Sequence, residues 1–319
     1  MLKTDLDFKK FNNLKRNLLK IYIYRSKNVS TYYCCPFCNS IHFIRYGKYN
    51  GIQRYICKEC KKTFSNTTNS AWKYLKKEPE KWIQFIELTL EGKTLKRCSE
   101  ILSMSITTAF YWRHKFFHAI EKTYKIKALE NSAEICVYMT NKCYKGSRNK
   151  HYTVEEKESN RITRRYRLPH GIDVLMVKED KKICFVRRTE PSESNSENFE
   201  NNILNIADKN CYMKLYRTNR WDLTQSIKHF NAKVNKKIRK KYESKSNINS
   251  ECRNFIAFLN MWKKKFRGIA TKYINHYYNF FSLVYAEEEF DYIDLFSEIL
   301  KNGLYISINN MRLTHAENY

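Results

Sequence analysis

The sequence predicts a multidomain α/β protein in which a small cysteine-rich module and a helical segment precede a larger α/β core. Three observations carry this prediction. Two Cys-x-x-Cys pairs lie near the start, apolar residues at helical spacing follow them, and from about residue 130 the apolar residues form strand-like runs. A chain of 319 residues is long enough for several domains. The boundaries that we predict are 1–30, 31–66, 67–125, 130–281 and 282–319.

The two cysteine pairs predict a structural zinc site in residues 31–66. The ligands would be Cys35, Cys38, Cys57 and Cys60. Four thiolates in two close pairs make a closed tetrahedral site that suits Zn²⁺, and their spacing is typical of a zinc ribbon. The alternatives are a disulfide pair or buried thiols that bind nothing. Cys34 adjoins the first pair, but Cys35 has the better spacing to Cys38.

The segment between the cysteine pairs predicts a basic β-hairpin. Apolar and polar residues alternate over 43–46 and 53–56, and Asn50-Gly51 between them is a strong hairpin-turn signal. Arg45 and Arg54 lie in these strands, and we predict that both contact DNA.

The net charge of +28 indicates a polyanionic partner, most simply DNA. The lysine bias of an AT-rich genome is the alternative explanation. Seven Gly and four Pro argue against long disordered segments, and no apolar run is long enough for a membrane span. The residues after Met1 contain no apolar h-region, so we expect no signal peptide and a reducing, cytoplasmic and nucleoid-associated location, or a nuclear one in a eukaryote. We expect no membrane partner and no small-molecule substrate.

Both ends of the chain differ in charge from the average. Residues 1–30 are basic and amphipathic and predict a leading helix. In residues 282–319 acids outnumber bases, and apolar residues recur among them. This acidic tail is either an ordinary amphipathic helix or a cover for the basic surface.

Residues 67–125 predict a helix-turn-helix. A first helix covers about 78–92 and is followed by helices at 95–102 and 106–115, with Ser105 as the N-cap of the last. Ile106, Ala109, Phe110 and Phe117 form its predicted buried stripe. The recognition helix of such a motif enters the major groove by its N-terminal end. The predicted DNA contacts on the other side are Thr107, Thr108, Tyr111 and Lys115. The alternative is a plain three-helix bundle with a solvated polar face.

Beyond residue 130 we predict strands at 133–139, 172–177, 182–186 and 211–215, with a helix at 197–207 before the last strand. Residues 225–281 predict helices. This order matches the opening of a ribonuclease-H-like α/β core. The basic loop after the first strand adds Arg164 and Arg165 as predicted DNA contacts, and Lys272 is a further one.

Three stretches resemble the insertion-sequence transposases of the ISXO-like group, which carry an N-terminal zinc ribbon. They are 55–65, with Tyr-Ile-Cys-Lys-Glu-Cys; 107–115, with Thr-Thr-Ala-Phe-Tyr-Trp-Arg-His-Lys; and 266–274, with Phe-Arg-Gly-Ile-Ala-Thr-Lys-Tyr-Ile. The resemblance implies a DDE-type strand transferase that works as a dimer or higher multimer on DNA. Such enzymes hold two Mg²⁺ ions with three acidic or amide side chains.

The resemblance also implies that the three metal-ligand positions are degenerate here. They fall on Cys136, Lys214 and Arg253, and two cations and a thiol are poor ligands for Mg²⁺. Glu134, two residues before Cys136, is a stand-in on the same strand face. We therefore expect a transposase-like DNA-binding protein without catalysis. The alternatives are an active Mg²⁺-dependent transposase that uses Glu134, and a zinc-ribbon nucleic-acid-binding regulator.

Overall fold

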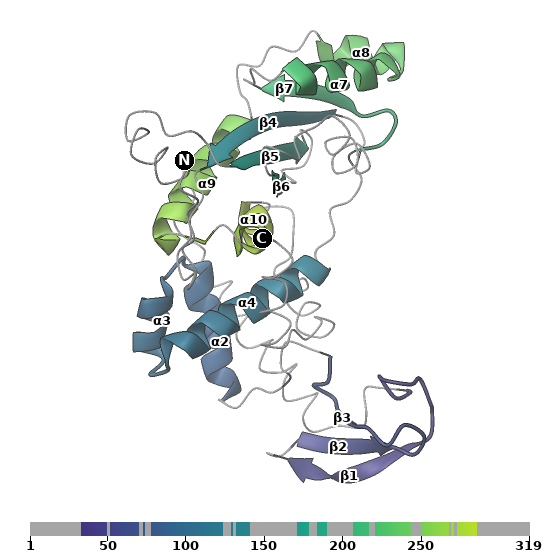
Figure 1. Cartoon of the computed structure of the whole chain (residues 1–319), viewed down its shortest axis with the longest axis vertical. Coiled ribbons are helices and arrows are strands. Elements are labelled where there is room, and N and C mark those ends of the chain that lie inside the picture. The colour runs from purple at the N-terminus through teal and green to yellow at the C-terminus, as the bar shows by residue number, and fades with distance from the viewer. Residues whose placement is uncertain are drawn as a thin grey trace, which may run out of the picture. The chain divides into compact units, whose positions relative to one another are not determined.

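The computed structural model describes residues 33–49, 52–69, 73, 78–123, 129, 132–140, 171–178, 184–189, 207–216, 221–243, 251–267, 269–270 and 273–285 (Figure 1). These residues fall into two compact units. The described residues up to 123 belong to the first unit, and those from 129 to 285 belong to the second. The mixed α/β class predicted from the sequence is confirmed.

The first unit begins with a three-stranded antiparallel sheet in the order β1-β2-β3. The strands are β1 (Phe43–Tyr49), β2 (Ile52–Cys57) and β3 (Thr63–Ser65). β1 and β2 form the predicted hairpin, in which Tyr49 pairs with Ile52; the turn residues 50–51 lie outside the described residues. The register shifts between Arg45 and Lys48, where Gly47 has a φ of +65° that other residues rarely adopt.

Three helices complete the described part of this unit: α2 (Pro79–Leu90), α3 (Leu95–Ile101) and α4 (Ile106–Thr123). α2 carries Pro in its first turn and ends before Gly92, whose φ is +78°. Thr94 caps α3 by accepting the N–H of Arg97. The helices are held together by aromatic side chains, and the Trp112 ring meets Trp82 edge-on with ring centroids 5.1 Å apart.

The second unit contains a four-stranded sheet in the order β6-β5-β4-β7. Its strands are β4 (Ser132–Thr140), β5 (Gly171–Lys178), β6 (Cys184–Thr189) and β7 (Tyr212–Tyr216). β4, β5 and β6 are antiparallel neighbours, whereas β7 pairs with β4 in parallel. Ala133 to Cys136 are all buried, because β4 lies inside the sheet and a helix packs on it.

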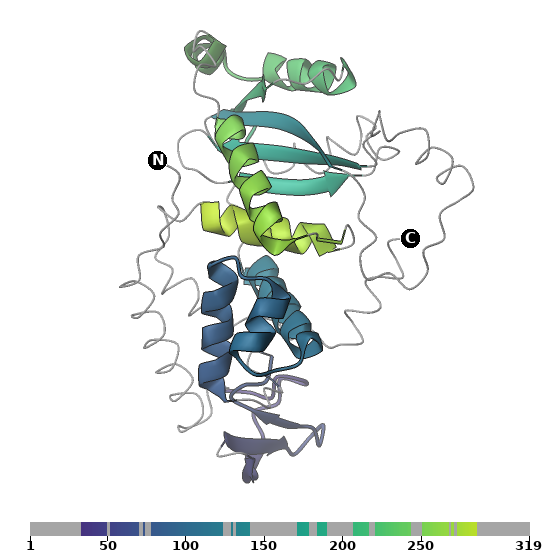
Figure 2. The same ribbon diagram turned by 90° about the vertical axis from the view of Figure 1, so that its left-hand side faces the viewer.

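Two helices pack on this sheet, and two more lie beside its β7 edge. α9 (Glu251–Phe266) crosses β4 and β5, and α10 (Ile274–Tyr285) lies against β6 (Figure 2). The two helices share a core of aromatic rings, in which Trp262 meets Phe280 edge-on with centroids 5.7 Å apart. α7 (Trp221–Ala232) and α8 (Lys236–Glu243) contact β7.

The outer edge of β7 is bonded by a side chain of α7. The Oδ1 atom of Asn231 accepts the N–H of Met213 at 2.9 Å, and its Nδ2 atom donates to the carbonyl of Met213 at 2.7 Å. The amide of Asn231 therefore takes the place that a neighbouring strand would occupy at that residue.

Most elements that the sequence predicts are present with shifted ends. The third core strand begins at Cys184 rather than near 182, and α10 continues past the predicted boundary at residue 281. The placement of Ile106 in the buried stripe is wrong, since 53 % of its surface is exposed. Ile106 is the first residue of α4, and helical period alone does not say whether a neighbouring helix reaches that far. The leading helix 1–30 and nearly all of the helix 197–207 and the acidic tail lie outside the described residues.

Candidate metal centre and candidate nucleic-acid interface

Four cysteine sulfurs converge at one end of the ribbon sheet. The ligand atoms of Cys35, Cys38, Cys57 and Cys60 all lie within 4.8 Å of one another. The Sγ atoms of Cys35 and Cys60 are 3.7 Å apart, and those of Cys38 and Cys57 are 3.5 Å apart. A tetrahedral ion with bonds of about 2.3 Å to sulfur needs sulfur separations of about 3.7–3.8 Å. The cluster therefore has the size and the donors that a metal ion such as zinc requires.

Two turns of the same construction position these sulfurs. In the first, the N–H of Cys35 bonds to the carbonyl of Ser40 at 2.7 Å, and the N–H of Asn39 returns to the carbonyl of Cys35 at 2.9 Å. In the second, Cys57 makes the equivalent pair of bonds with Lys62 and Lys61, both at 3.1 Å. Asn39 and Lys61 each adopt a positive φ. The backbone N–H groups of Ser40, Glu59 and Cys60 bond to sulfurs of the cluster.

Cys34 lies outside the cluster, although it is next in the chain to Cys35. Cys35 is fully buried and packs with Cys57, Tyr55 and Phe64, whereas Cys34 is only half-buried. The cluster thus contains Cys35 and not Cys34.

The cluster thiols differ in acidity. Burial would raise the pKa of Cys57, but the N–H groups of Cys60 and Glu59 and the thiols of Cys38 and Cys60 lower it to about 6. The backbone at Ser40 would lower the pKa of Cys38, but desolvation and the other three thiols raise it to about 12. One thiolate therefore forms readily, and a bound cation would have to displace the later protons.

The ribbon also carries exposed basic and aromatic side chains. The Arg54 guanidinium lies 5.6 Å from the centroid of the Tyr46 ring and donates to the Thr63 hydroxyl at 3.1 Å. Arg45 is exposed on β1, but it pairs with Tyr55 and therefore lies on the opposite face of the sheet from Arg54. Exposed large apolar residues of the ribbon are Tyr33, Phe37, Ile41, Ile44, Tyr46 and Tyr49. Such a mixture of cations and rings can bind phosphates and stack on bases.

The residues predicted to contact DNA on α4 have different surroundings. Ser105 caps the helix as predicted, since its hydroxyl accepts the N–H of Thr108 at 3.1 Å. Thr107 is exposed, while Thr108 and Tyr111 are half-buried. Lys115 donates to the backbone carbonyl of Lys73, and burial, helped by the charge of Lys73, lowers its pKa to about 7.

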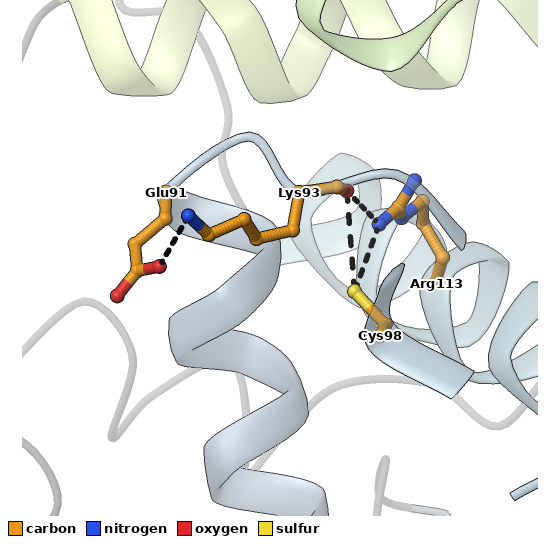
Figure 3. A network of polar contacts seen from close by, with 4 residues as sticks. All are labelled: Glu91, Lys93, Cys98 and Arg113. Atoms are coloured by element: carbon orange, nitrogen blue, oxygen red, sulfur yellow. Dashed lines mark hydrogen bonds and ion pairs between the residues drawn. The ribbon is translucent and has the colours of Figure 1, made fainter. Parts of the chain in front are cut away.

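Arg113 is a buried cation that the sequence analysis missed. Only 1 % of its surface is exposed, and its Nη2 atom donates to the carbonyl of Lys93 at 2.7 Å and lies 3.6 Å from the Cys98 sulfur (Figure 3). Lys93 in turn lies 3.6 Å from the Glu91 carboxylate. Arg113 thereby ties α4 to the turn between α2 and α3. A cation at an apolar position of the α4 stripe was the available signal.

Cys136, Lys214 and Arg253, the positions expected from the resemblance, come from segments that meet in the second unit. Across the parallel pair of β4 and β7, Glu134 lies opposite Lys214 and Cys136 lies opposite Tyr216. The Nε atom of Arg253, in the first turn of α9, donates to the Tyr216 hydroxyl at 3.2 Å. Cys136 is buried.

Glu134 has a structural partner at this place. Its Oε2 atom accepts the N–H of Cys252 at 2.9 Å, and its backbone carbonyl faces the Cys252 sulfur at 3.5 Å. A carboxylate at the first N–H groups of α9 is favourable for the helix dipole. Within the part of the chain that the structure describes, the four cysteines are the one cluster of three or more His, Cys, Asp or Glu side chains close enough to hold a metal. Arg164, Arg165 and Lys272 lie outside the described residues.

Comparison with known proteins gives one weak likeness. Over 88 residues, the chain is 27 % identical to an uncharacterised protein in the transposable element ISH50 of Halobacterium salinarum. The matched stretch is 27 % of this chain and 30 % of that protein, so the chain spans under a third of the relative's length. No family model matches the chain, and no solved structure matches it. In the described ranges, none of the helices combines the length and the apolar character needed to span a membrane.

Proposed function

We propose that this protein is a DNA-binding derivative of an insertion-sequence transposase, with a zinc-stabilised ribbon and a strand-transfer site that has lost its ligands for Mg²⁺. The observation that carries the proposal is the convergence of four cysteine sulfurs within 4.8 Å beside a basic, aromatic sheet face. A closed four-thiolate site has no open position for a substrate, so its role would be structural.

The ribbon face and the first turn of α4 are the two surfaces that would contact DNA. Arg45 and Arg54 lie on neighbouring strands but on opposite faces of one small sheet, and Arg54 shares its face with the Tyr46 ring. The turn between α3 and α4 leaves Thr107 exposed near the beginning of α4, as a recognition helix requires. Arg113 would hold the angle between the helices constant while Thr107 meets the base edges.

The topology of the second unit supports descent from a transposase. Three antiparallel strands followed by a fourth that pairs in parallel with the first is the order expected of a ribonuclease-H-like sheet. The likeness to a protein of a mobile element points the same way. At the ligand positions, however, Lys214 and Arg253 carry positive charge and would repel Mg²⁺.

DNA recognition is tested by selecting preferred sites from a random duplex library and measuring their binding by fluorescence anisotropy. We expect Arg54→Gln to weaken binding to all duplexes, and Thr107→Ala to weaken it more for selected sites than for random ones. Lys81→Gln is the matched control, because this lysine lies on α2 and pairs with Glu78 at 3.8 Å. Equal affinity of all four proteins for the selected duplex would contradict the proposal.

The catalytic alternative is tested by nicking of supercoiled plasmid with Mg²⁺ or Mn²⁺. We expect no cleavage by the native protein, and cleavage by the Cys136→Asp/Lys214→Asp/Arg253→Asn variant if the fold tolerates the three changes. Cleavage by the native protein that is abolished in Glu134→Gln would establish an active transposase instead. Glu134→Gln is a suitable probe, because its amide oxygen can still accept the Cys252 N–H.

A further inference from the structure

Helices α7 and α8 of the second unit carry a run of exposed cations. Between Asp222 and Glu243 the chain contains no acid. The lysines and the arginine of this run are all exposed; they are Lys228, Lys233, Lys236, Lys237, Arg239, Lys240 and Lys241. None of them belongs to the ribbon or to α4, so the proposed recognition surfaces do not account for this charge.

The first turn of α8 contains positive charges that the helix dipole disfavours. Asn235 caps the helix, since its Oδ1 atom accepts the N–H of Lys237 at 2.9 Å and its carbonyl accepts that of Arg239 at 3.0 Å. Lys236 and Lys237 therefore occupy the first two helical positions, where the helix dipole disfavours cations. The first turn contains no acid to offset them.

The repulsion continues along the helix on one side. Lys236 and Lys240 lie four residues apart, as do Lys237 and Lys241, and like charges at this spacing destabilise a helix. At about 100° per residue these four lysines cover an arc of roughly 140°. Ile238 and Tyr242 fall on the opposite side, and the Tyr242 ring stacks on Tyr212 of β7 with centroids 6.4 Å apart. The apolar side of α8 thus faces the sheet, and its cations face solvent.

We infer that this cationic surface of α7 and α8 binds the phosphate backbone of duplex DNA. The inference rests on the proposed function for the identity of the polyanion, and it adds a second contact surface on the other unit. A helix that lies in a membrane surface needs an exposed apolar side as well as cations. On α8 the apolar side is taken by β7, so an anionic membrane is the less suitable partner.

Backbone contacts of this kind carry no sequence preference, and their strength depends steeply on salt. The second unit would thus hold any duplex, while the first unit selects among sequences. Each lysine in contact with a phosphate contributes about one unit to the slope of log affinity against log salt. The slope therefore reports how many cations of this surface contact phosphates.

The test compares Lys236→Gln/Lys237→Gln with Lys209→Gln/Lys264→Gln in the full-length protein loaded with zinc. Both variants lose two exposed cations of the second unit, and only the first loses them from α8. Affinity for a random duplex is measured from 50 to 200 mM salt. We expect the loss of affinity over this range to be on the order of tenfold smaller in the α8 variant than in the native protein. The control variant should follow the native protein.

Thermal unfolding completes the test, because removing cations from the N-terminus of α8 should leave the melting temperature unchanged or raise it. Should the α8 variant fail to fold, Lys228→Gln/Lys233→Gln probes the same surface. An unchanged salt slope in the folded α7 or α8 variant would overturn the inference. Equal slope changes in both double variants would also overturn it, because general charge would then be the cause.

Two further outcomes separate the inference from the proposed function. A reduced slope in the α8 variant, together with unchanged selected-site binding in Thr107→Ala and Arg54→Gln, would support the α8 surface and reject the recognition surfaces. Salt-dependent binding of the native protein to vesicles rich in phosphatidylserine, without measurable binding to random duplex, would instead identify a membrane surface and overturn the inference.

Discussion

The cysteine cluster of the first unit and the place in the second unit where Cys136, Lys214 and Arg253 lie are both places where distant residues converge. In the ribbon, four identical donors meet within 4.8 Å. In the core, Lys214 lies opposite Glu134, and Arg253 bonds to Tyr216. The backbone that brings residues together is thus present in both regions, and the side chains that would bind a metal are present in one. A backbone that brings distant positions together is therefore not sufficient evidence for a metal centre.

The two regions also differ in what holds them together. The described ribbon core consists of Cys35, Tyr55, Cys57 and Phe64, with Phe43 and Cys60 packed against it. So few residues bury too little apolar surface to fold a module of this size alone. The second unit, in contrast, has an aromatic core between α9 and α10 in addition to its sheet. Metal should therefore matter for the ribbon and not for the core.

The largest effect is expected from loss of a cysteine ligand. Cys57→Ser should abolish stoichiometric zinc binding and unfold residues 33–69, because structural zinc contributes about 10–16 kcal/mol in small modules. Cys34→Ser is the matched control and should retain zinc, since Cys34 lies outside the cluster. Zinc content by mass spectrometry and amide dispersion by NMR measure both. Zinc loss in Cys34→Ser alone would contradict the ligand assignment.

An intermediate effect on stability is expected from substitution of Arg113. A loss of stability in the zinc-loaded protein would show that the helices of the first unit have a core that does not depend on zinc. Arg113→Leu should destabilise the unit by about 1–3 kcal/mol, because the Lys93 carbonyl loses its buried donor. Arg97→Leu removes an exposed pair with Glu100 at 3.3 Å and should cost less than about 1 kcal/mol. Urea unfolding followed by tryptophan fluorescence measures the difference. Equal stabilities of the two variants would reject a role for Arg113 in joining the helices.

A separate effect concerns pH and Lys115. Its pKa is lowered from 10.5 to about 7 in the folded protein, so between these values the unfolded chain binds more protons than the folded one. The contribution of Lys115 to stability should therefore rise as the pH rises from about 7 to 10.5. Lys115→Met should remove this dependence, and the exposed Lys96→Gln should retain it. Urea unfolding of the three proteins between pH 7 and 10 tests this, and parallel curves for all three would contradict it.

The sequence was most informative where the chemistry is local. The cysteine pairs and the hairpin between them could be predicted, because ligand spacing and turn residues lie within one short segment. The N-cap Ser105 and the proline at the start of α2 could be predicted for the same reason.

Contacts between distant segments could not be predicted in this way. The bond from Glu134 to Cys252 joins residues 118 positions apart, and nothing near either residue indicates it. The position of Arg113 on the apolar stripe of α4 indicates burial, but its partner, the Lys93 carbonyl, lies 20 positions away and could not be predicted. The exposure of Ile106 likewise depends on where neighbouring helices end, and no pattern within α4 specifies that.

The side-chain amide of Asn231 has a consequence for aggregation through the β7 edge of the sheet. Edge strands present unpaired backbone groups, and these are templates on which a second chain can add a strand and begin to aggregate. At Met213, on the outer edge of β7, a side chain of the same molecule already occupies both backbone groups. A strand from another molecule could not form hydrogen bonds to either backbone group of Met213. Asn231 should therefore reduce self-association through this edge of the sheet.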